Sequence, residues 1–335
     1  MKIVTYVPAG APAHSEGRAG LLHNDLILDL AELGVWAGRN GAATPTLPST
    51  TLALLQQGAE GMAAARAALD LAAKARPEDL RAESGVAHAA SAVSLRTPVP
   101  NPPTLRDFYA FEQHVKAARA RRNVGMIPEW YQIPVFYFSN TAALYGDGEA
   151  IPYPRLSKEL DFELEIAAVI GESGSDISAD DAPRYIAGYM VMNDWSARDL
   201  QRAEMVMNLG PAKGKDFATS LGPWLVTPDE LADKRIGSGK DERYDLEMNG
   251  SINGDHLTHA NFKDLYFSFP QMIERAAQHV RLRPGDVIGS GTCGTGCILE
   301  LGTERHRWLQ PGDVVDMSIE RLGAITNRIV AAPEK

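Results

Sequence analysis

The chain has 335 residues, of which 44% are hydrophobic and 23% charged, so it is neither a disordered tail nor a fibrous repeat. Its 33 basic and 43 acidic side chains give a formal net charge of −10, which argues against a nucleic-acid partner, because phosphate backbones are themselves negative. Only two cysteines are present, too few for a zinc quartet or a disulfide framework and typical of the reducing cytoplasm, where we expect this protein to reside.

The first 97 residues predict a small N-terminal α+β domain. They begin with short strand-like runs and turns, and the run at the start is too short for the core of a signal peptide. An alanine-rich stretch over Thr51–Ala75 then predicts a packing helix. Four prolines between Thr97 and Thr104 fix an extended segment that cannot be helical. We therefore place a domain boundary there, which gives domains over residues 1–97 and 98–335.

Beyond the boundary, short β-branched runs alternate with turns rich in proline and glycine. This alternation predicts a β-rich α+β domain or roll rather than a doubly wound sheet. No stretch of about 18 apolar residues occurs, so we expect no membrane span. The predicted strands are Phe162–Ile170, Tyr189–Met192, Val287–Gly289, Ile298–Leu301 and Val314–Ile319, and the clearest helix is Ser268–Val280.

Three acidic residues alternate with apolar ones in the first of these strands. Asp161, Glu163 and Glu165 would share one face, because successive side chains of a strand point to opposite sides. Neighbouring carboxylates repel one another, so this face is either solvated or surrounds a cation. Oxygen ligands of this kind suit Mg²⁺, Mn²⁺ or Ca²⁺ rather than zinc. The segment alone leaves both interpretations open.

Two further segments carry polar residues with suggestive spacing. Asp194 follows an apolar strand-like run, and on spacing alone it is an ordinary helix N-cap. Arg198 and Gln201 would then share one face of the following helix. Asp107 and His114 are seven residues apart, so a helix would aim both at one centre, although a single histidine in a polar helix is usually a surface residue.

Two glycine-containing segments resemble nucleotide-binding loops only superficially. Gly289–Gly294 matches G-x-G-x-x-G, but the residues that follow, Thr295–Leu301, predict a turn and a strand where a dinucleotide fingerprint opens a helix. Gly210–Asp216 ends in aspartate where a phosphate loop has serine or threonine. Neither G-x-S-x-G nor H-E-x-x-H occurs in the chain. The sequence thus gives no support to a nicotinamide oxidoreductase, a serine hydrolase or a zinc protease.

Six motifs in order give the chain a resemblance to the fumarylacetoacetate hydrolase family, clear over residues 98–330 and loose over the first 95. They are Asp107-Phe108-Tyr109 with His114, Glu163-Leu164-Glu165, Asn193–Gln201, Gly214–Phe217, Gly289–Thr292 and Leu299-Glu300-Leu301. The resemblance implies a mixed β-sandwich roll, a homodimer, and one divalent cation per chain, Mg²⁺ or Ca²⁺ with Mn²⁺ as an alternative.

The resemblance also implies a role for each matching position. The metal ligands would be the four carboxylates Asp107, Glu163, Glu165 and Asp194. His114 would be the general base, oriented by Glu300. The donors that steady the substrate would be Arg198, Gln201 and Lys215, and the substrate contacts would be Tyr109, Tyr137 and Thr292.

The implied reaction is hydrolysis of a C–C bond in a 1,3-diketo acid such as fumarylacetoacetate, in the breakdown of aromatic acids or of aromatic amino acids such as tyrosine. A hard cation suits this chemistry, because two oxygens of the substrate can chelate it and it can stabilise the departing enolate. The alternatives are an acylpyruvate or fumarylpyruvate hydrolase, and a decarboxylase or isomerase of 2-oxo diacids.

The sequence leaves open which arginine binds a substrate carboxylate and whether the cation is catalytic or structural. The segment after His114 is shorter than in the animal fumarylacetoacetate enzyme, where an arginine grips a substrate carboxylate; the candidates here are Arg119, Arg121 and Arg122. The acidic cluster would also suit a structural cation in a non-catalytic binding protein. His114 argues against this alternative, because a structural site has no need of a base.

Overall fold

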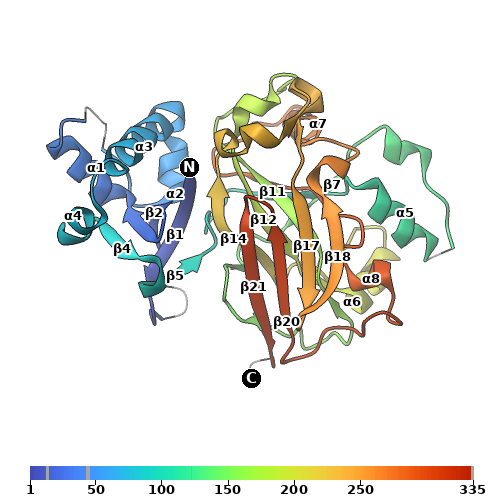
Figure 1. Cartoon of the computed structure of the whole chain (residues 1–335). Helices are drawn as coiled ribbons and strands as arrows, with labels where there is room; N and C mark the ends of the chain where they lie inside the picture. The colour runs from blue at the N-terminus through green and yellow to red at the C-terminus, as the bar shows by residue number, and fades with distance from the viewer. Residues whose placement is uncertain (13–14, 43–45, 122, 333–335) are drawn as a thin grey trace.

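The computed structural model describes residues 1–12, 15–42, 46–121 and 123–332. Its N-terminal part lies to one side of the molecule (Figure 1, blue to cyan). The predicted helix over Thr51–Ala75 is two helices, because Gly58 at their junction has a positive φ of 63°. The elements of this part are β1 (Lys2–Pro8), β2 (Arg18–His23), β3 (Leu26–Asp29), α1 (Leu30–Arg39), α2 (Thr51–Gln56), α3 (Gly58–Ala72), α4 (Pro77–Ala82), β4 (Ala87–Ala89) and β5 (Val93–Arg96).

The remainder of the described chain is rich in strands. The strands are β6 (Leu105–Phe108), β7 (Phe136–Ser139), β8 (Leu144–Tyr145), β9 (Ile151–Pro152), β10 (Leu160–Asp161), β11 (Leu164–Ile170), β12 (Ile186–Asp194), β13 (Ser196–Ala197), β14 (Thr219–Val226), β15 (Arg235–Ile236), β16 (Arg243–Tyr244), β17 (Glu247–Ile252), β18 (Asp255–Asn261), β19 (Val287–Gly289), β20 (Val314–Ile319) and β21 (Gly323–Val330). The α-helices are α5 (Glu112–Ala120), α6 (Arg198–Met205), α7 (Phe269–Ala277) and α8 (Ile298–Leu301).

Among the described residues, the strands form one sheet of 12 strands, one of 5, and two small pairs, β10-β13 and β15-β16. The main path of the large sheet runs β4-β3-β2-β1-β14-β12-β11-β19-β6-β7, and the small sheet runs β18-β17-β20-β21-β9. β20 and β21 of the small sheet pack against β12 and β14 of the large one, as Figure 1 shows. The fold is therefore a β-rich α+β structure with mixed sheets, as the sequence predicts.

The central strands of the large sheet are buried on both faces. In β11, Ile166, Ala168 and Ile170 belong to the core beneath the small sheet. Ala167 and Val169 point the other way, into the core shared with the N-terminal helices. A strand covered on both sides needs a continuous apolar run, which is what the sequence carries there.

The N-terminal part is joined to the rest of the chain through β1. β2 pairs with one edge of this strand, and β14 and β5 pair with successive parts of its other edge. The boundary predicted near residue 98 falls just after β5, and the division into domains there stays a prediction. Within the described part of the chain, no helix is both long and apolar enough to cross a membrane.

One predicted strand is wrong. Ile298–Leu301 is the short helix α8, and the reason lies far away in the sequence. The carboxylate of Asp161 accepts hydrogen bonds from the backbone N–H groups of Ile298 at 2.8 Å and Leu299 at 3.0 Å. These are N–H groups of the first helical turn, which have no partner inside a helix. The predicted helix over Ser268–Val280 is present as α7, with Ser268 as its N-cap.

Candidate active site

Three carboxylates from neighbouring parts of the large sheet converge on one point. Asp107 lies in β6, Glu165 in β11 and Asp194 at the end of β12. All three are buried, and one ligand oxygen of each lies within 4.8 Å of the others. β19 runs between β6 and β11 and places Gly289 beside Asp107. A Cβ at Gly289 would lie 2.4 Å from Asp107 Oδ1, so only glycine allows this approach.

The backbone of the glycine loop also holds this acidic group. The N–H of Gly291 donates to Asp107 Oδ1 at 3.1 Å and to Glu165 Oε2 at 3.0 Å. Gly291 has a φ of +76°, and a Cβ there would meet the carbonyl oxygen of Phe108 at 2.5 Å. The G-x-G-x-x-G match thus serves close packing around carboxylates.

The electrostatics of the three carboxylates fit a bound cation. Burial and the neighbouring Asp194 raise the pKa of Asp107 to about 8. The pKa of Glu165 lies well above its usual range, for the same reason of burial among carboxylates. Glu165 Oε1 and Asp194 Oδ1 are buried and have no hydrogen-bond partner among the described residues. A divalent ion would offset the repulsion between these buried carboxylates and would bind the two oxygens that lack a partner. An all-oxygen donor set suits Mg²⁺, Mn²⁺ or Ca²⁺.

Glu163, the fourth predicted ligand, points to two cationic side chains instead. Its Oε2 accepts a hydrogen bond from Lys215 Nζ, and its Oε1 lies 2.7 Å from the guanidinium of Arg198. Burial raises the pKa of Glu163, but Arg198 and Lys215 outweigh burial and hold it below the usual value. Lys215 Nζ also donates to Asp194 Oδ2 at 2.5 Å. The structure thus groups three of the four predicted ligands and places Glu163 beside them.

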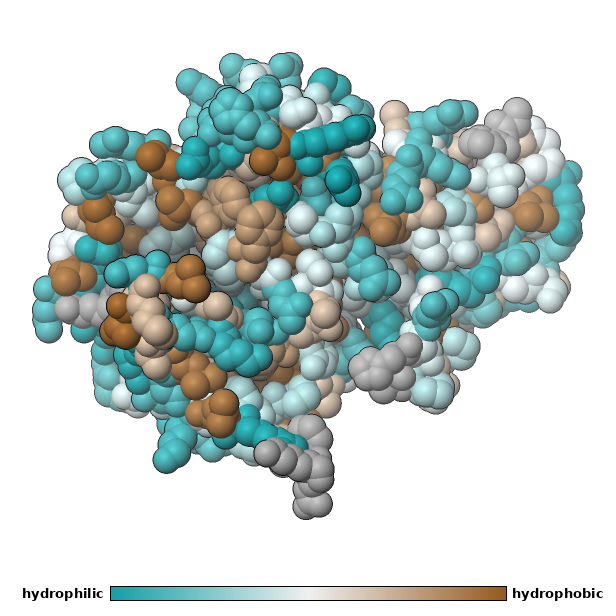
Figure 2. Space-filling model, turned by 180° about the vertical axis from the view of Figure 1, so that it is seen from behind, coloured by the Kyte–Doolittle hydropathy of each residue, from teal (hydrophilic) through white to brown (hydrophobic). Residues whose placement is uncertain are grey.

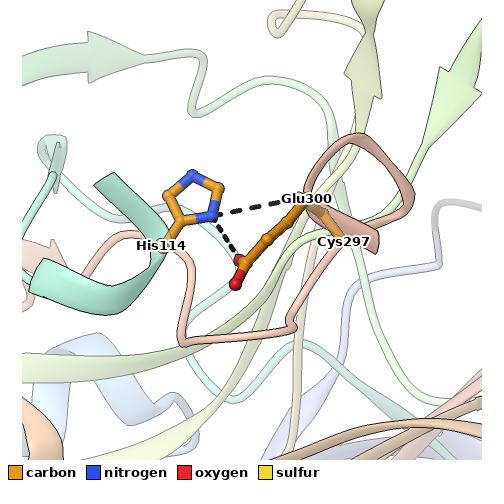
Figure 3. A group of neighbouring side chains, drawn as sticks. All are labelled: His114, Cys297 and Glu300. Carbon is orange, nitrogen blue, oxygen red and sulfur yellow. Dashed lines mark hydrogen bonds and ion pairs between the residues drawn. The ribbon is translucent and has the colours of Figure 1, made fainter. Parts of the chain in front are cut away.

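His114 and Glu300 form a hydrogen-bonded pair near the acidic group. His114 Nδ1 lies 3.0 Å from Glu300 Oε2, and Figure 3 shows the other ring nitrogen directed away from Glu300. An ionised carboxylate only accepts hydrogen bonds, so Nδ1 carries the proton and Nε2 bears the lone pair. The N–H of Thr295 fixes the second oxygen of Glu300 at 2.8 Å.

Three expectations about how these residues are placed are wrong. Asp107 and His114 do not share a helix, because Asp107 lies in β6 and His114 in α5. His114 is buried rather than on the surface, because its ring lies against Glu300 and Cys297. Asp194 is no helix N-cap, because it ends β12, and α6 begins only at Arg198.

Asp161 has a role that sequence analysis missed. Arg198 and Gln201 share the buried face of α6, and the Arg198 guanidinium lies 3.1 Å from the Gln201 side-chain oxygen. Arg198 Nε donates to Asp161 Oδ2 at 2.8 Å. The same carboxylate holds the start of α8, the helix that carries Glu300. Asp161 therefore links Arg198 to the helix that carries Glu300. In the sequence, its position in the alternating acidic segment is the one signal that points to a role in the site.

Tyr137, a predicted substrate contact, also touches the acidic group. Its hydroxyl donates to Asp107 Oδ2 at 3.3 Å and to Asp194 Oδ2. Tyr109 precedes α5, and its ring packs edge-on against His114 with the ring centroids 5.6 Å apart. Both tyrosines therefore lie where the acidic group meets the His114–Glu300 pair.

A pocket of about 690 Å³ opens onto this site. All predicted site residues except Asp194 and Glu300 line it, Thr292 and Gln201 among them. Arg119 lies at its wall, whereas Arg121 binds the carbonyl oxygens of Glu300 and Leu301 in α8. Arg122 lies outside the described residues. Figure 2 shows apolar side chains gathered on the left of the molecule, the part opposite the N-terminal unit.

Residues 104–330, more than half of the chain, match the family described as fumarylacetoacetate (FAA) hydrolase C-terminal. The chain belongs to the fumarylacetoacetate hydrolase family. A fumarylacetoacetase from Oryza sativa subsp. japonica is 30% identical over 372 residues, which cover 91% of this chain and 86% of that protein. An oxaloacetate tautomerase from Bacillus subtilis (strain 168) is 29% identical over 294 residues, which cover 85% of this chain and 87% of that protein.

Solved structures of the family share the fold. A fumarylacetoacetate hydrolase from psychrophilic Exiguobacterium antarcticum superposes with a TM-score of 0.71 at 22% identity, covering 99% of both chains. A maleylpyruvate hydrolase from Sphingobium sp. SYK-6, solved with manganese(II) and pyruvate, has a TM-score of 0.68 at 22% identity, covering 99% of this chain and 100% of that one. The relatives are thus enzymes that include both hydrolases and tautomerases.

Proposed function

We propose that this member of the fumarylacetoacetate hydrolase family uses a divalent cation to hydrolyse a C–C bond of a 1,3-diketo acid. The observation that carries the proposal is the His114–Glu300 pair, 3.0 Å from atom to atom, beside three buried carboxylates that suit a hard cation. A base with its own orienting carboxylate is what activation of water requires. The candidate substrates are fumarylacetoacetate and acylpyruvates of the fumarylpyruvate type.

Asp107, Glu165 and Asp194 would hold the cation, and Glu163 is linked to Asp194 through Lys215 Nζ. When bound, such an ion polarises the oxygens of a diketo acid and stabilises an enolate leaving group. Mg²⁺ and Ca²⁺ remain the first candidates. Mn²⁺ is a further one, because the maleylpyruvate hydrolase of Sphingobium was solved with that ion.

His114 would take the proton from the attacking water. Its Nδ1–H stays on Glu300, so the lone pair of Nε2 is the free basic position. The proton then passes to the carbon that leaves as an enolate. Thr295 holds Glu300 at its other oxygen, so the imidazole keeps one orientation throughout the reaction.

Lys215 would meet the negative charge that develops on the attacked carbonyl oxygen. Its ammonium has three N–H donors, of which two meet Glu163 and Asp194, and its side chain lines the pocket. The third N–H has no hydrogen-bond partner among the described residues, so it can face the substrate. Arg198 is held by Asp161 and Gln201, so we assign it to positioning Glu163 and Gln201.

The wall of the pocket suits a carboxylate on the substrate. Arg119 and Arg202 both line the pocket, and a guanidinium pairs well with a carboxylate. A diacid from the breakdown of tyrosine or other aromatic compounds in the cytoplasm would present such a group. We propose Arg119 as its first partner, because Arg121 is bound to α8.

Product analysis in ¹⁸O-labelled water tests the hydrolysis. We expect one label in the carboxylic acid released from the acyl half of fumarylpyruvate or fumarylacetoacetate. Unlabelled products, or carbon dioxide as a product, would refute hydrolysis and the role of His114 as the base that activates water.

A second candidate reaction is tautomerisation of a 2-oxo diacid, favoured by the likeness to an oxaloacetate tautomerase over 85% of this chain. There the same imidazole would move a proton between carbon and oxygen, without water as a reactant. Loss of the enol absorbance of oxaloacetate, with deuterium uptake from D₂O and no cleavage, would favour this reaction over hydrolysis.

We also propose that the enzyme is a homodimer. Val206, Met207 and Leu209 follow α6 and are 78%, 70% and 87% exposed, and Leu209 lines the pocket. A second copy would cover these apolar side chains. Sedimentation of the wild type beside Leu209→Asp tests this, and a monomeric wild type at assay concentration would refute it.

A further inference from the structure

Cys297 lies against the His114–Glu300 pair without a part in the proposed reaction. Its sulfur is 3.9 Å from His114 Nδ1, and Nδ1 is 3.0 Å from Glu300 Oε2. One donor atom each of His114, Cys297 and Glu300 lies within 4.8 Å of the other two. Figure 3 shows the three side chains meeting at the imidazole edge.

The spacing of these atoms matches the coordination shell of a zinc-like ion. Zn–N, Zn–S and Zn–O bonds of about 2.0 to 2.3 Å in a tetrahedron place the ligand atoms roughly 3.3 to 3.6 Å apart. The observed separations of 3.0 and 3.9 Å lie on either side of that range. The third separation, between the Cys297 sulfur and a Glu300 oxygen, is within 4.8 Å. Movements of up to about 1 Å would therefore form the shell, with the fourth position left for water.

The chemistry of the donors separates this group from the acidic one. Imidazole, thiolate and carboxylate together suit Zn²⁺ or Co²⁺, whereas Mg²⁺ and Ca²⁺ prefer oxygen ligands. Burial raises the pKa of the Cys297 thiol well above its usual value, the carboxylates of Asp161 and Glu163 add to the rise, and the Arg198 guanidinium opposes it. The thiol therefore stays protonated until an ion displaces its proton.

The ligand-bearing segments are also anchored. The N–H of Thr295 holds Glu300 Oε1 at 2.8 Å, which leaves Oε2 for an ion. Arg121 binds the carbonyl oxygens at the end of α8. His114 lines the pocket, which gives an ion a path from solvent. The group therefore has fixed ligands, a supporting shell and an entrance.

We propose that His114, Cys297 and Glu300 form a second metal site that binds Zn²⁺-class ions and that its occupation inhibits the enzyme. On binding, the thiol loses one proton to solvent, and the imidazole proton shifts from Nδ1 to Nε2. The histidine stays neutral but loses the basic lone pair of Nε2. The inhibition rests on the proposed function of the pair; the binding does not.

Co²⁺ is the probe for the site. Enzyme saturated with Mg²⁺ is titrated with Co²⁺, and we expect the near-ultraviolet charge-transfer band of a cobalt thiolate, reaching its maximum at one equivalent. Cys297→Ser should abolish the band. Cys293→Ser is the matched control, because Cys293 is equally buried and lies outside the group, so it should keep the band.

Inhibition is measured separately, with Zn²⁺ added to the Mg²⁺ enzyme. We expect Cys297→Ser to retain the basal rate and to need at least tenfold more Zn²⁺ for half inhibition, whereas Cys293→Ser behaves as wild type. A wild type without the thiolate band, or a band lost only in Cys293→Ser, overturns the site. A band at one equivalent without inhibition overturns the inhibitory consequence and counts against the proposed role of His114.

Discussion

Removing the cation should make the stability of the protein fall as the pH rises. The pKa of Asp107 is raised from 3.8 to about 8 in the folded chain. Between these two values the metal-free folded protein keeps a proton that the unfolded chain has released. Because the folded state binds more protons, the free energy of unfolding decreases with pH, by about 1.4 kcal/mol per pH unit for one proton.

The expected size of this effect follows from the pH interval. From pH 5.5 to 7.5 the loss is about 2 to 3 kcal/mol for one proton. With an unfolding entropy of roughly 2.1 cal/mol/K per residue over 335 residues, the melting temperature should fall by about 3 to 4 °C. A bound divalent ion keeps the carboxylates ionised in the folded state and should remove this contribution.

Differential scanning fluorimetry of chelated and Mn²⁺-saturated protein at the two pH values measures the effect. The stabilisation by Mn²⁺ should be larger at pH 7.5 than at pH 5.5, and Asp107→Asn should reduce both the stabilisation and its dependence on pH. Two results would refute the assignment of the acidic group as a cation site. One is a stabilisation by Mn²⁺ that is equal at both pH values. The other is a stabilisation by Mn²⁺ that becomes smaller between pH 5.5 and pH 7.5.

Three substitutions test the remaining roles. His114→Gln should lower kcat about 10²- to 10⁴-fold in steady-state assays while Mn²⁺ still raises the melting temperature; a near-wild-type rate would exclude it as the base. Lys215→Met should lower kcat about 10²-fold or more with little change in KM. An effect on KM alone would show that Lys215 binds the substrate and the transition state equally well and does not stabilise the developing charge. Asp161→Asn, which weakens a buried pair with Arg198, should cost about 3 kcal/mol in denaturant unfolding and lower kcat as α8 loosens; unchanged stability and kcat would show that the link to α8 is unimportant.

Some strands of the fold were predictable because their β-branched, apolar sequences suit the buried sheet positions that they occupy. Val287–Gly289 and Val314–Ile319 are strands with the predicted bounds, since β-branched runs between turns have few alternatives. The pairing of Glu163 with Lys215 was not predictable from spacing, because the two residues are 52 positions apart. Only the fold decides which cationic side chain meets which carboxylate.

Helix α8 shows why one local prediction failed. Its four residues, Ile298–Leu301, are apolar enough to resemble a strand, and no four-residue segment forms a helix by its own propensity. The decisive group is the carboxylate of Asp161, which binds the first N–H groups of the helix. A tertiary contact thus sets the secondary structure, and with it the position of Glu300.

The balance of charge around the site supports the proposed cation. Five carboxylates, those of Asp107, Asp161, Glu163, Glu165 and Asp194, are buried there with the two cations Arg198 and Lys215. Both cations are engaged by Glu163, so Asp107 and Glu165 are left without a positive partner among the described residues, and theirs are the pKa values raised furthest. The alternating acidic strand alone left both a solvated face and a cation site open. Burial favours the cation site, because these carboxylates lie against one another with little exposure to water, and a divalent ion would neutralise the excess charge.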